Sequence, residues 1–192
     1  MLSENKKIIE ILYIISFIIF AVGSVAGSFY FKYNFSGTES VENYLSGYVS
    51  SLKTGMDFKS LVNASIKNYA ILFIIIAISS LFKVGPLFSG AVLLRKGFVN
   101  AFTASAMFDI YNFKGVILSL VFIPQILLIF PLTALLNAVC ITYLSKRAYF
   151  ERKDKIIYII FLVVVFTIFC ISAVCEGFLT TTFMKWISNK VT

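Results

Sequence analysis

Histidine is absent from this 192-residue chain, and cysteine is limited to three residues. The absence of histidine removes the commonest general base and the commonest transition-metal ligand. Cys140, Cys170 and Cys175 lie inside apolar stretches without metal-ligand spacing, so we expect small core residues rather than a disulfide framework or a metal site. No H-E-x-x-H, G-x-S-x-G, DFG-type or P-loop pattern occurs. The sequence therefore predicts a protein that is not an enzyme and that holds no cofactor.

Charge is also scarce, at 14% of residues against about 25% in an ordinary soluble domain, whereas 59% are hydrophobic. The apolar residues form continuous stretches on the roughly 20-residue scale of a bilayer, rather than the alternating pattern of a transmembrane β-barrel. Spanning segments of this kind are helices. We therefore predict an all-α fold, a polytopic membrane helical bundle that forms a single domain over residues 1–192.

The apolar stretches predict about five spans, with a polar segment over residues 32–68 between the first two; the spans are residues 8–31, 69–84, 86–108, 116–144 and 156–184. Pro86 suits the first turn of a helix, which would start the third span there. The alternative is a long second helix that ends at Arg95 and Lys96, and the sequence leaves both open. Pro124 and Pro131 fall on nearly the same helical face and each frees a backbone carbonyl, so a kinked or broken fourth span is expected.

The formal net charge is +8, but the 17 basic residues gather at the ends of the expected spans. Basic residues in such places set membrane orientation and contact anionic headgroups, so we expect membrane lipid, and not nucleic acid, as a partner. The connection between the last two spans carries Lys146, Arg147, Arg152, Lys153 and Lys155, which predicts that it is cytoplasmic. Counting spans then places the amino terminus in the cytoplasm, and residues 32–68 and the carboxyl terminus outside the cell membrane.

Two patterns predict helix contacts. Gly23 and Gly27 form a G-x-x-x-G pattern in the first span, whose missing side chains let another helix approach closely. Packing within the molecule is favoured over a homo-oligomer. In the polar segment, a capping box formed by Ser36 and Glu39 precedes apolar residues at helical intervals. This amphipathic helix either lies on the bilayer or bundle surface or provides a protein-docking face, for which the candidate partner-binding residues are Tyr44, Leu45, Tyr48 and Leu52.

Ionisable residues occur deep within the apolar stretches at only a few places: Lys83, Arg95, Lys96, Asp109 and Glu176. Such groups are costly in hydrocarbon and are usually retained for a partner, a polar cavity or a pathway. Lys83 and Asp109 fall at expected turns. Glu176 lies about 20 residues beyond the cytoplasmic start of its span, near the outer edge of the hydrocarbon. This depth separates it from Arg95 and Lys96 by over roughly 15 Å, so a direct pair requires a re-entrant or broken helix.

Glu176 is therefore predicted to be a polar joint near the outer surface, where partner proteins meet the bundle, without a well-placed partner at its own depth. Gln125 is expected to have a structural role. Its side-chain amide can donate a hydrogen bond to a backbone carbonyl that Pro124 leaves without a partner, or it can bond to another helix. Gly97 is expected to mark a turn or a close approach of helices.

Several short stretches, taken in order, resemble the stage II sporulation protein M family of endospore-forming bacteria. They are FKSLVNASIKN at 58–68, Gly85 with Pro86, Lys96 with Gly97, IPQILLIFP at 123–131, and Glu176, Gly177 and Phe178 in the last span. Together they cover about residues 55–180, with a fitting first helix. Broader relatives often carry a Pro-His-Gly pattern and a glutamate where this chain has Gln125, Ile126 and Ile129, and that difference favours a scaffold over a transporter.

The resemblance implies a mother-cell membrane protein of the engulfment machinery that performs no chemistry itself. It implies that such a protein holds two peptidoglycan-degrading partners, stage II sporulation proteins D and P, at the septal membrane. The alternative that the charged residues suggest is a small bacterial transporter, channel or permease subunit, which would use Glu176 together with Arg95 and Lys96.

Overall fold

Long apolar runs fold into helices here because a helix satisfies its own backbone hydrogen bonds. The computed structural model of the chain describes residues 2–35, 43, 58–111, 125–146 and 152–191. Within these ranges there are five α-helices, one π-helical turn and no strand, so the predicted all-α fold is confirmed. The elements are, in chain order, α1 (Leu2–Asn34), α3 (Phe58–Ser79), α4 (Gly85–Tyr111), η2 (Gln125–Ile129), α6 (Phe130–Lys146) and α7 (Arg152–Val191).

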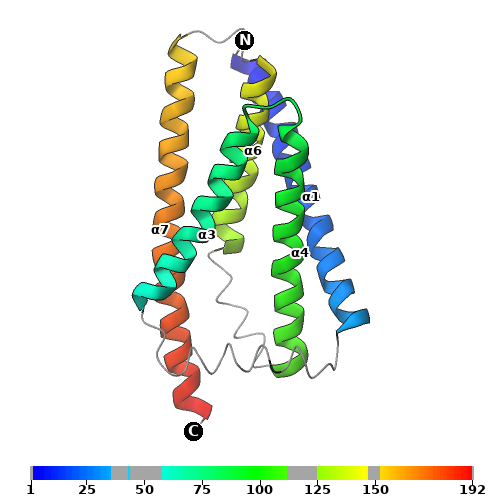
Figure 1. The fold of residues 1–192 in the computed structure, drawn as a ribbon, viewed down its shortest axis with the longest axis vertical. Helices are drawn as coiled ribbons and strands as arrows, with labels where there is room; N and C mark the ends of the chain where they lie inside the picture. The colour runs from blue at the N-terminus through cyan, green and yellow to red at the C-terminus, as the bar shows by residue number, and fades with distance from the viewer. Residues whose placement is uncertain (1, 36–42, 44–57, 112–124, 147–151, 192) are drawn as a thin grey trace.

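Successive α-helices run in alternating directions along the long axis of the bundle, and the chain ends lie at its opposite ends (Figure 1). α3 runs antiparallel along α7. Its first turns contact α7 where a Cβ at Gly177 would lie 2.5 Å from Val62 Cγ2. At the other end of α3, Tyr158 of α7 donates a hydrogen bond to the Ser80 hydroxyl at 3.1 Å. The α3–α7 pair therefore extends over nearly the whole of α3.

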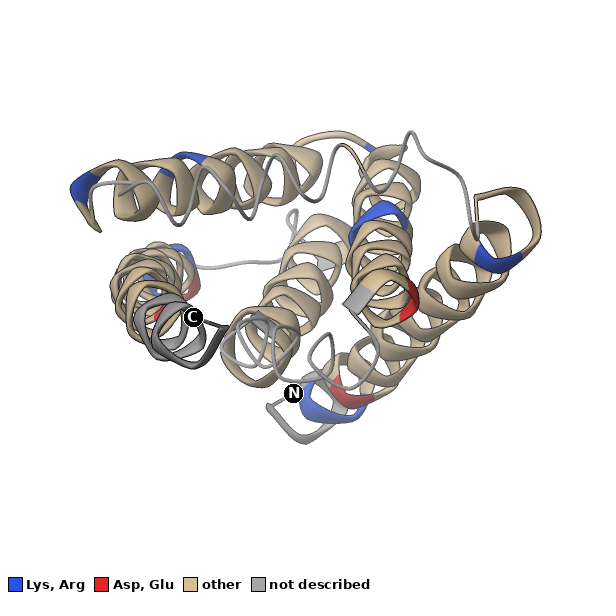
Figure 2. Cartoon of the chain, turned by 90° about the horizontal axis from the view of Figure 1, so that it is seen from below, with Lys and Arg blue, Asp and Glu red and all other residues tan. Residues whose placement is uncertain are grey.

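Four of the helices are long and apolar enough to cross a membrane: Lys6–Asn34, Phe58–Ser79, Ile126–Ser145 and Arg152–Thr182. Their outward faces carry many exposed large apolar side chains, and charged residues interrupt the bundle at few places (Figure 2). The chain is therefore a membrane-associated protein. α4, the expected third span, is not among these four because Arg95 and Lys96 make it less apolar near its centre, but it packs against α1 and α3.

The second and third spans meet at a short turn over residues 80–84, and α4 begins at Gly85. The sequence left two boundaries open, and the structure has the one in which a new helix starts near Pro86. Pro86 lies in the first turn of α4. A Cβ at Gly85 would lie 1.7 Å from the Ser79 carbonyl oxygen, so only glycine fits this turn. Lys83 lies in the turn as expected, whereas Asp109 lies inside the last turn of α4.

α3 begins at Phe58, eleven residues before the expected start of the second span at residue 69. The polar lead-in over residues 58–68 therefore continues the membrane helix. α1 and α7 also extend beyond their apolar runs, to Asn34 and Val191. The reason is that polar residues at the end of a span keep their helical hydrogen bonds while they reach the headgroup layer.

The fourth span contains an irregular helix, as its prolines predict. η2 is a π-helical turn that leads directly into α6, and Pro131 is the second residue of α6. Proline lacks an N–H and cannot complete the ladder to the preceding turn, which favours a locally wider helix. The Thr133 hydroxyl donates to the carbonyl oxygens of Ile129 at 2.6 Å and Phe130 at 2.8 Å, so it adds partners where the ladder is weakened. Gln125 begins η2, whereas Pro124 lies outside the described residues.

The buried apolar core lies between α3, α6 and α7. Its residues come from one face of each helix and from η2: Tyr69, Leu72, Ile76, Ile129, Leu136, Cys140, Val165, Phe169 and Ala173. The other half of the bundle is the α1–α4 pair, which packs through glycines. Cβ atoms at Gly23 and Gly27 would each lie 2.2 Å from carbonyl oxygens of α4, and one at Gly97 would lie 2.3 Å from the Phe20 carbonyl oxygen of α1. The G-x-x-x-G pattern thus serves packing within the molecule.

We expect Gly23→Ala to lower the free energy of unfolding in detergent by about 1–3 kcal/mol, because the added methyl group must push the α4 backbone away. Gly90→Ala is the matched control: the nearest atom to its Cβ would be Ile19 Cδ1 at 3.7 Å, so stability should be unchanged or slightly higher. Chemical or thermal unfolding of both variants measures the difference. Equal stability of the two variants, with loss of a dimer for Gly23→Ala alone, would instead assign the pattern to a homo-oligomer.

Candidate functional site

Four polar residues from three helices lie close together on α3, α4 and α7, with Tyr69 buried and Asn68 exposed. The Tyr69 hydroxyl of α3 donates a hydrogen bond to Glu176 Oε2 of α7 at 2.5 Å. The neighbouring residue on α3, Asn68, accepts a hydrogen bond from Lys96 Nζ of α4 at 3.2 Å. Two adjacent residues of α3 therefore bind a cation on one side and an acid on the other. We call Asn68, Tyr69, Lys96 and Glu176 the polar cluster.

The polar cluster lies well inside the apolar layer. Asn68 is eleven residues before the end of α3, and Lys96 is eleven residues after the start of α4. At 1.5 Å per residue both lie roughly 17 Å from the turn that joins the two helices, about half the thickness of a hydrocarbon layer. Glu176 is six residues before the end of its span at Thr182, roughly 9 Å inside it. No member of the cluster lies at a helix end.

The expectation that Glu176 has no partner at its depth is wrong. Tyr69, which is 2% exposed, is its hydrogen-bond partner, and the Glu176 carboxylate also acts electrostatically on Lys96. The bond joins α3 to α7, so it does not bear on the direct pair with Arg95 or Lys96 for which a re-entrant helix was expected to be necessary. The depth estimate considered Arg95 and Lys96 as partners, whereas the hydrogen-bond donor is the hydroxyl of Tyr69 on α3. The sequence signal that was missed is Asn68 followed by Tyr69 directly before a long apolar run.

The cluster also explains how α4 keeps a charged lysine in this layer. An isolated charge in hydrocarbon is costly, and the cost falls when the charge has hydrogen-bond partners and a nearby opposite charge. Lys96 has both, through Asn68 and Glu176. A hydroxyl donated to a carboxylate is a strong, charge-assisted bond, so Tyr69 stabilises Glu176 in the same way. Lys96 and Glu176 together contribute no net charge to the layer.

Two hollows meet at Lys96. An inner cavity of about 20 Å³ lies between the helices, which is room for about one water molecule, and Lys96 and Tyr69 both line it. A larger groove of about 230 Å³ lies between α3 and α4 on the outside of the bundle. Its lining residues are Asn68, Ile71, Leu72, Ile75, Val92, Arg95, Lys96 and Val99. We call this the α3–α4 groove; its walls are apolar, and its polar groups are two cations and an amide.

Arg95 differs from Lys96 in its surroundings. Its side chain is exposed and lines the α3–α4 groove from the outside. It lies ten residues after the start of α4, roughly 15 Å from the turn, and therefore near the middle of the layer. Within the part of the chain that the structure describes, no residue accepts a hydrogen bond from Arg95. Arg95 thus presents a permanent positive charge to whatever lies in the α3–α4 groove.

Two further polar contacts hold helices together outside the cluster. The Tyr158 ring of α7 stacks on Tyr143 of α6 at 3.9 Å between centroids, and its hydroxyl lies 3.3 Å from Cys140 Sγ. Asn137 of α6 donates a hydrogen bond to the Ser16 hydroxyl of α1 at 2.9 Å, and both residues are buried. All three cysteines are free, but Cys175 is exposed, so the expectation that it is a core residue is wrong, whereas Cys140 is buried as expected. These contacts join α1, α6 and α7 and are structural in character.

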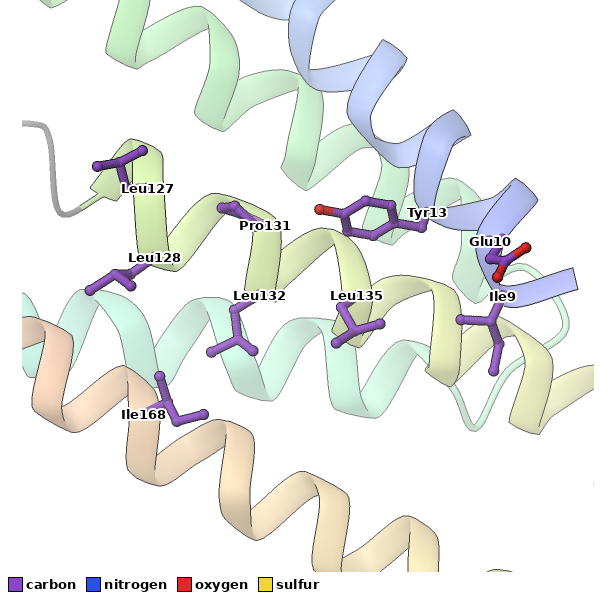
Figure 3. Close-up of a pocket in the computed structure, with 9 residues that line it drawn as sticks. All are labelled: Ile9, Glu10, Tyr13, Leu127, Leu128, Pro131, Leu132, Leu135 and Ile168. Carbon is purple, nitrogen blue, oxygen red and sulfur yellow. The ribbon is translucent and has the colours of Figure 1, made fainter. Parts of the chain in front are cut away.

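A third hollow lies on the outer face between α1, η2, α6 and α7 (Figure 3). It has a volume of about 410 Å³ and is lined mainly by apolar side chains: Ile9, Glu10, Tyr13, Leu127, Leu128, Pro131, Leu132, Leu135 and Ile168. In Figure 3 the Tyr13 ring lies along the groove toward Pro131, and Glu10 lies at one end. An apolar outward groove of this kind suits the acyl chains of membrane lipid, the partner that the composition predicts.

The predicted site residues fall into separate places. Arg95, Lys96 and Glu176 belong to the groove or the cluster, whereas Gly23, Gly27 and Gly97 belong to the α1–α4 contact and Pro131 to the start of α6. The predicted partner-binding residues Tyr44, Leu45, Tyr48 and Leu52 lie outside the described residues, so that docking face stays a prediction. Among the described residues no group of three His, Cys, Asp or Glu side chains is placed to hold a metal ion.

We expect Tyr69→Phe to lower the free energy of unfolding in detergent by about 1 kcal/mol, because the variant leaves Glu176 without the hydroxyl that donates to it. Tyr33→Phe, at a side chain that is 78% exposed, is the matched control and should change nothing. Unfolding curves of both variants in the same detergent give the comparison. If both variants matched the wild type, the Tyr69–Glu176 bond would have no structural role.

Comparisons of the chain with protein-family models, with curated proteins and with solved structures find no match in any of the three. The candidate site is accordingly defined by its geometry. It consists of the polar cluster across α3, α4 and α7 and of the α3–α4 groove beside it, where Arg95 is exposed.

Proposed function

We propose that this chain is a non-enzymatic membrane scaffold of the sporulation engulfment complex. In this role it holds the peptidoglycan hydrolases stage II sporulation proteins D and P at the septal membrane of the mother cell. The sequence resemblance to the stage II sporulation protein M family motivates the proposal. The observation in the structure that supports it is the exposed Arg95 near the middle of the layer, in the α3–α4 groove whose walls are apolar.

An exposed guanidinium at this depth favours assembly with another membrane protein. Arginine stays charged at any physiological pH, so it cannot escape the cost of hydrocarbon by losing a proton. Intramembrane charges nearly always face a protein interior or a water-filled cavity. Arg95 faces outward into the α3–α4 groove, so a second protein that covers the groove would give it such an interior. A scaffold needs contacts of this kind with its partners.

The arrangement of the helices supports the proposed orientation. The amino terminus, the α3–α4 turn and the start of α7 lie at one end of the bundle (Figure 1). This end collects basic residues from all three segments: Lys6, Lys7, Lys83, Arg152, Lys153 and Lys155. We propose that it faces the cytoplasm, as the positive-inside rule favours. The end of α1 and the start of α3 then lie on the opposite side, toward the cell wall where the hydrolases act (Figure 1).

The scaffold proposal predicts that the purified chain, in nanodiscs, retains both hydrolases in a pull-down, whereas empty nanodiscs do not. Tyr48→Ser should weaken retention at unchanged stability, because this residue belongs to the predicted docking face of the segment between α1 and α3. Tyr33→Ser, the same change at the end of α1, is the matched control. Failure of the wild-type chain to retain either hydrolase, together with normal hydrolase localisation in cells that lack it, would contradict the proposal.

A transporter or channel subunit is the second candidate, and the polar cluster beside an inner cavity is the observation that favours it. A carboxylic acid and a lysine linked through neighbouring polar groups can bind and release protons or ions along a pathway. In this role Glu176→Gln should abolish an ion or proton flux in proteoliposomes, whereas Glu10→Gln, on the outer groove, should preserve it. The absence of any flux with the wild-type chain under imposed gradients would contradict this candidate.

A further inference from the structure

The α3–α4 groove combines two properties that rarely occur together on a surface inside a bilayer. Its walls are apolar, with Ile71 and Ile75 from α3 and Val92 and Val99 from α4. Its polar groups are cations and an amide, with Arg95 at the outer rim and Lys96 farther in. The lining positions on each helix recur at intervals of three or four residues, so each wall is a helical ridge and the space between them is a groove along the helix axes.

We propose that this groove binds a membrane-spanning helix of a partner protein that carries one carboxylate side chain near the middle of the bilayer, and that Arg95 pairs with that carboxylate. This inference rests on the proposed scaffold function and specifies the chemistry of the partner. Ridge-into-groove packing against Ile71, Ile75 and Val99 supplies the apolar contact, and the ion pair supplies the register along the helix axis.

The charges of the cluster explain why the partner group is a carboxylate and why Arg95 binds it. Lys96 already has Asn68 as its acceptor and Glu176 as a nearby opposite charge. Among the residues that line the α3–α4 groove, Arg95 is then the cation without a bound acceptor, and one carboxylate neutralises it. A guanidinium offers two parallel N–H donors to a carboxylate, which fixes both the position and the rotation of the incoming helix.

The depth of Arg95 favours a spanning helix over a lipid headgroup as the occupant. Arg95 lies roughly 15 Å from the turn between α3 and α4, near the centre of a hydrocarbon layer of about 30 Å. Lipid phosphates lie at the edges of that layer. A side chain on a helix that crosses the layer reaches the centre without distortion of the bilayer.

The proposal is tested with synthetic spanning peptides of about 20 leucine residues that carry a single Glu, Gln or Leu at the centre. The full-length chain, in phosphatidylcholine nanodiscs, is titrated with each labelled peptide, and binding is read by energy transfer. We expect the Glu peptide to bind about tenfold more tightly than the Gln peptide, the size of one strong polar contact between membrane helices. Arg95→Gln should remove this difference, and Arg95→Lys should retain part of it.

Lys83→Gln is the matched control, because it removes a cation from the α3–α4 turn and leaves the groove intact. It should bind the peptides as the wild type does. Equal binding of the Glu and Gln peptides, or a preference for Glu that survives Arg95→Gln, would overturn the proposal. Displacement of the Glu peptide by phosphatidylglycerol added to the nanodiscs, with cross-linking of that lipid to α4, would also overturn it in favour of an anionic lipid site.

The same variants separate this inference from the scaffold function. If the hydrolases are retained by the wild-type chain and equally by Arg95→Gln, the groove is not their docking place, although the scaffold function stands. If the Glu peptide binds through Arg95 but neither hydrolase is retained, the groove accepts an acidic spanning helix from another protein and the engulfment function fails.

Discussion

An ammonium and a carboxylate inside an apolar bundle need donors and acceptors from neighbouring helices, because bilayer hydrocarbon offers neither. α3 supplies both through adjacent residues: Asn68 accepts from Lys96 on α4, and Tyr69 donates to Glu176 on α7. The two bonds fix the rotation of α3 between its neighbours, because turning α3 about its axis breaks at least one of them. The apolar core and the α3–α4 groove both depend on this rotation of α3.

The glycine contact between α1 and α4 also helps to hold the charged residues of α4 within the bundle. α4 is the least suited of the five described α-helices to a membrane, since Arg95 and Lys96 lie near its centre. Its glycine-bearing face packs closely on Gly23 and Gly27 of α1, while the face that carries its cations is turned toward α3. A strongly apolar helix thus holds a weakly apolar one in the layer. The cation that remains outside, Arg95, is the group around which we propose that a partner assembles.

The polar cluster and the proposed scaffold role fit together physically. Buried ionic groups are weak sources of stability, but they specify one arrangement of helices against its alternatives. A scaffold needs a fixed outer surface more than it needs a mobile pathway. The same groups would serve a transporter only if the bonds of Tyr69 and Lys96 exchanged during a cycle. The two roles therefore differ in whether these bonds are permanent, which is a property of dynamics rather than of composition.

Parts of the site were visible in the sequence one residue at a time. The cost of charge in hydrocarbon singled out Lys96 and Glu176, and the missing side chains of Gly23 and Gly27 indicated a close helix contact. Asn68 and Tyr69 were missed because they precede the most apolar run of their helix, so that the span was expected to start where the cluster lies. The search for a partner of Glu176 was also limited to charged residues, and so it missed the tyrosine hydroxyl that donates to Glu176.

The sequence by itself determined that the chain is helical and membrane-associated and that the fourth span is irregular around Pro131, and it offered a turn at Gly85 and Pro86 as one of two boundaries between helices. These are local properties, set by apolar run length and by the backbone chemistry of proline and glycine. Only the tertiary structure decided which helix receives the glycine face of α1, and that Tyr69 pairs with Glu176 while Arg95 stays exposed. Those outcomes depend on the rotation of each helix against its neighbours, which residues far apart in the chain determine together.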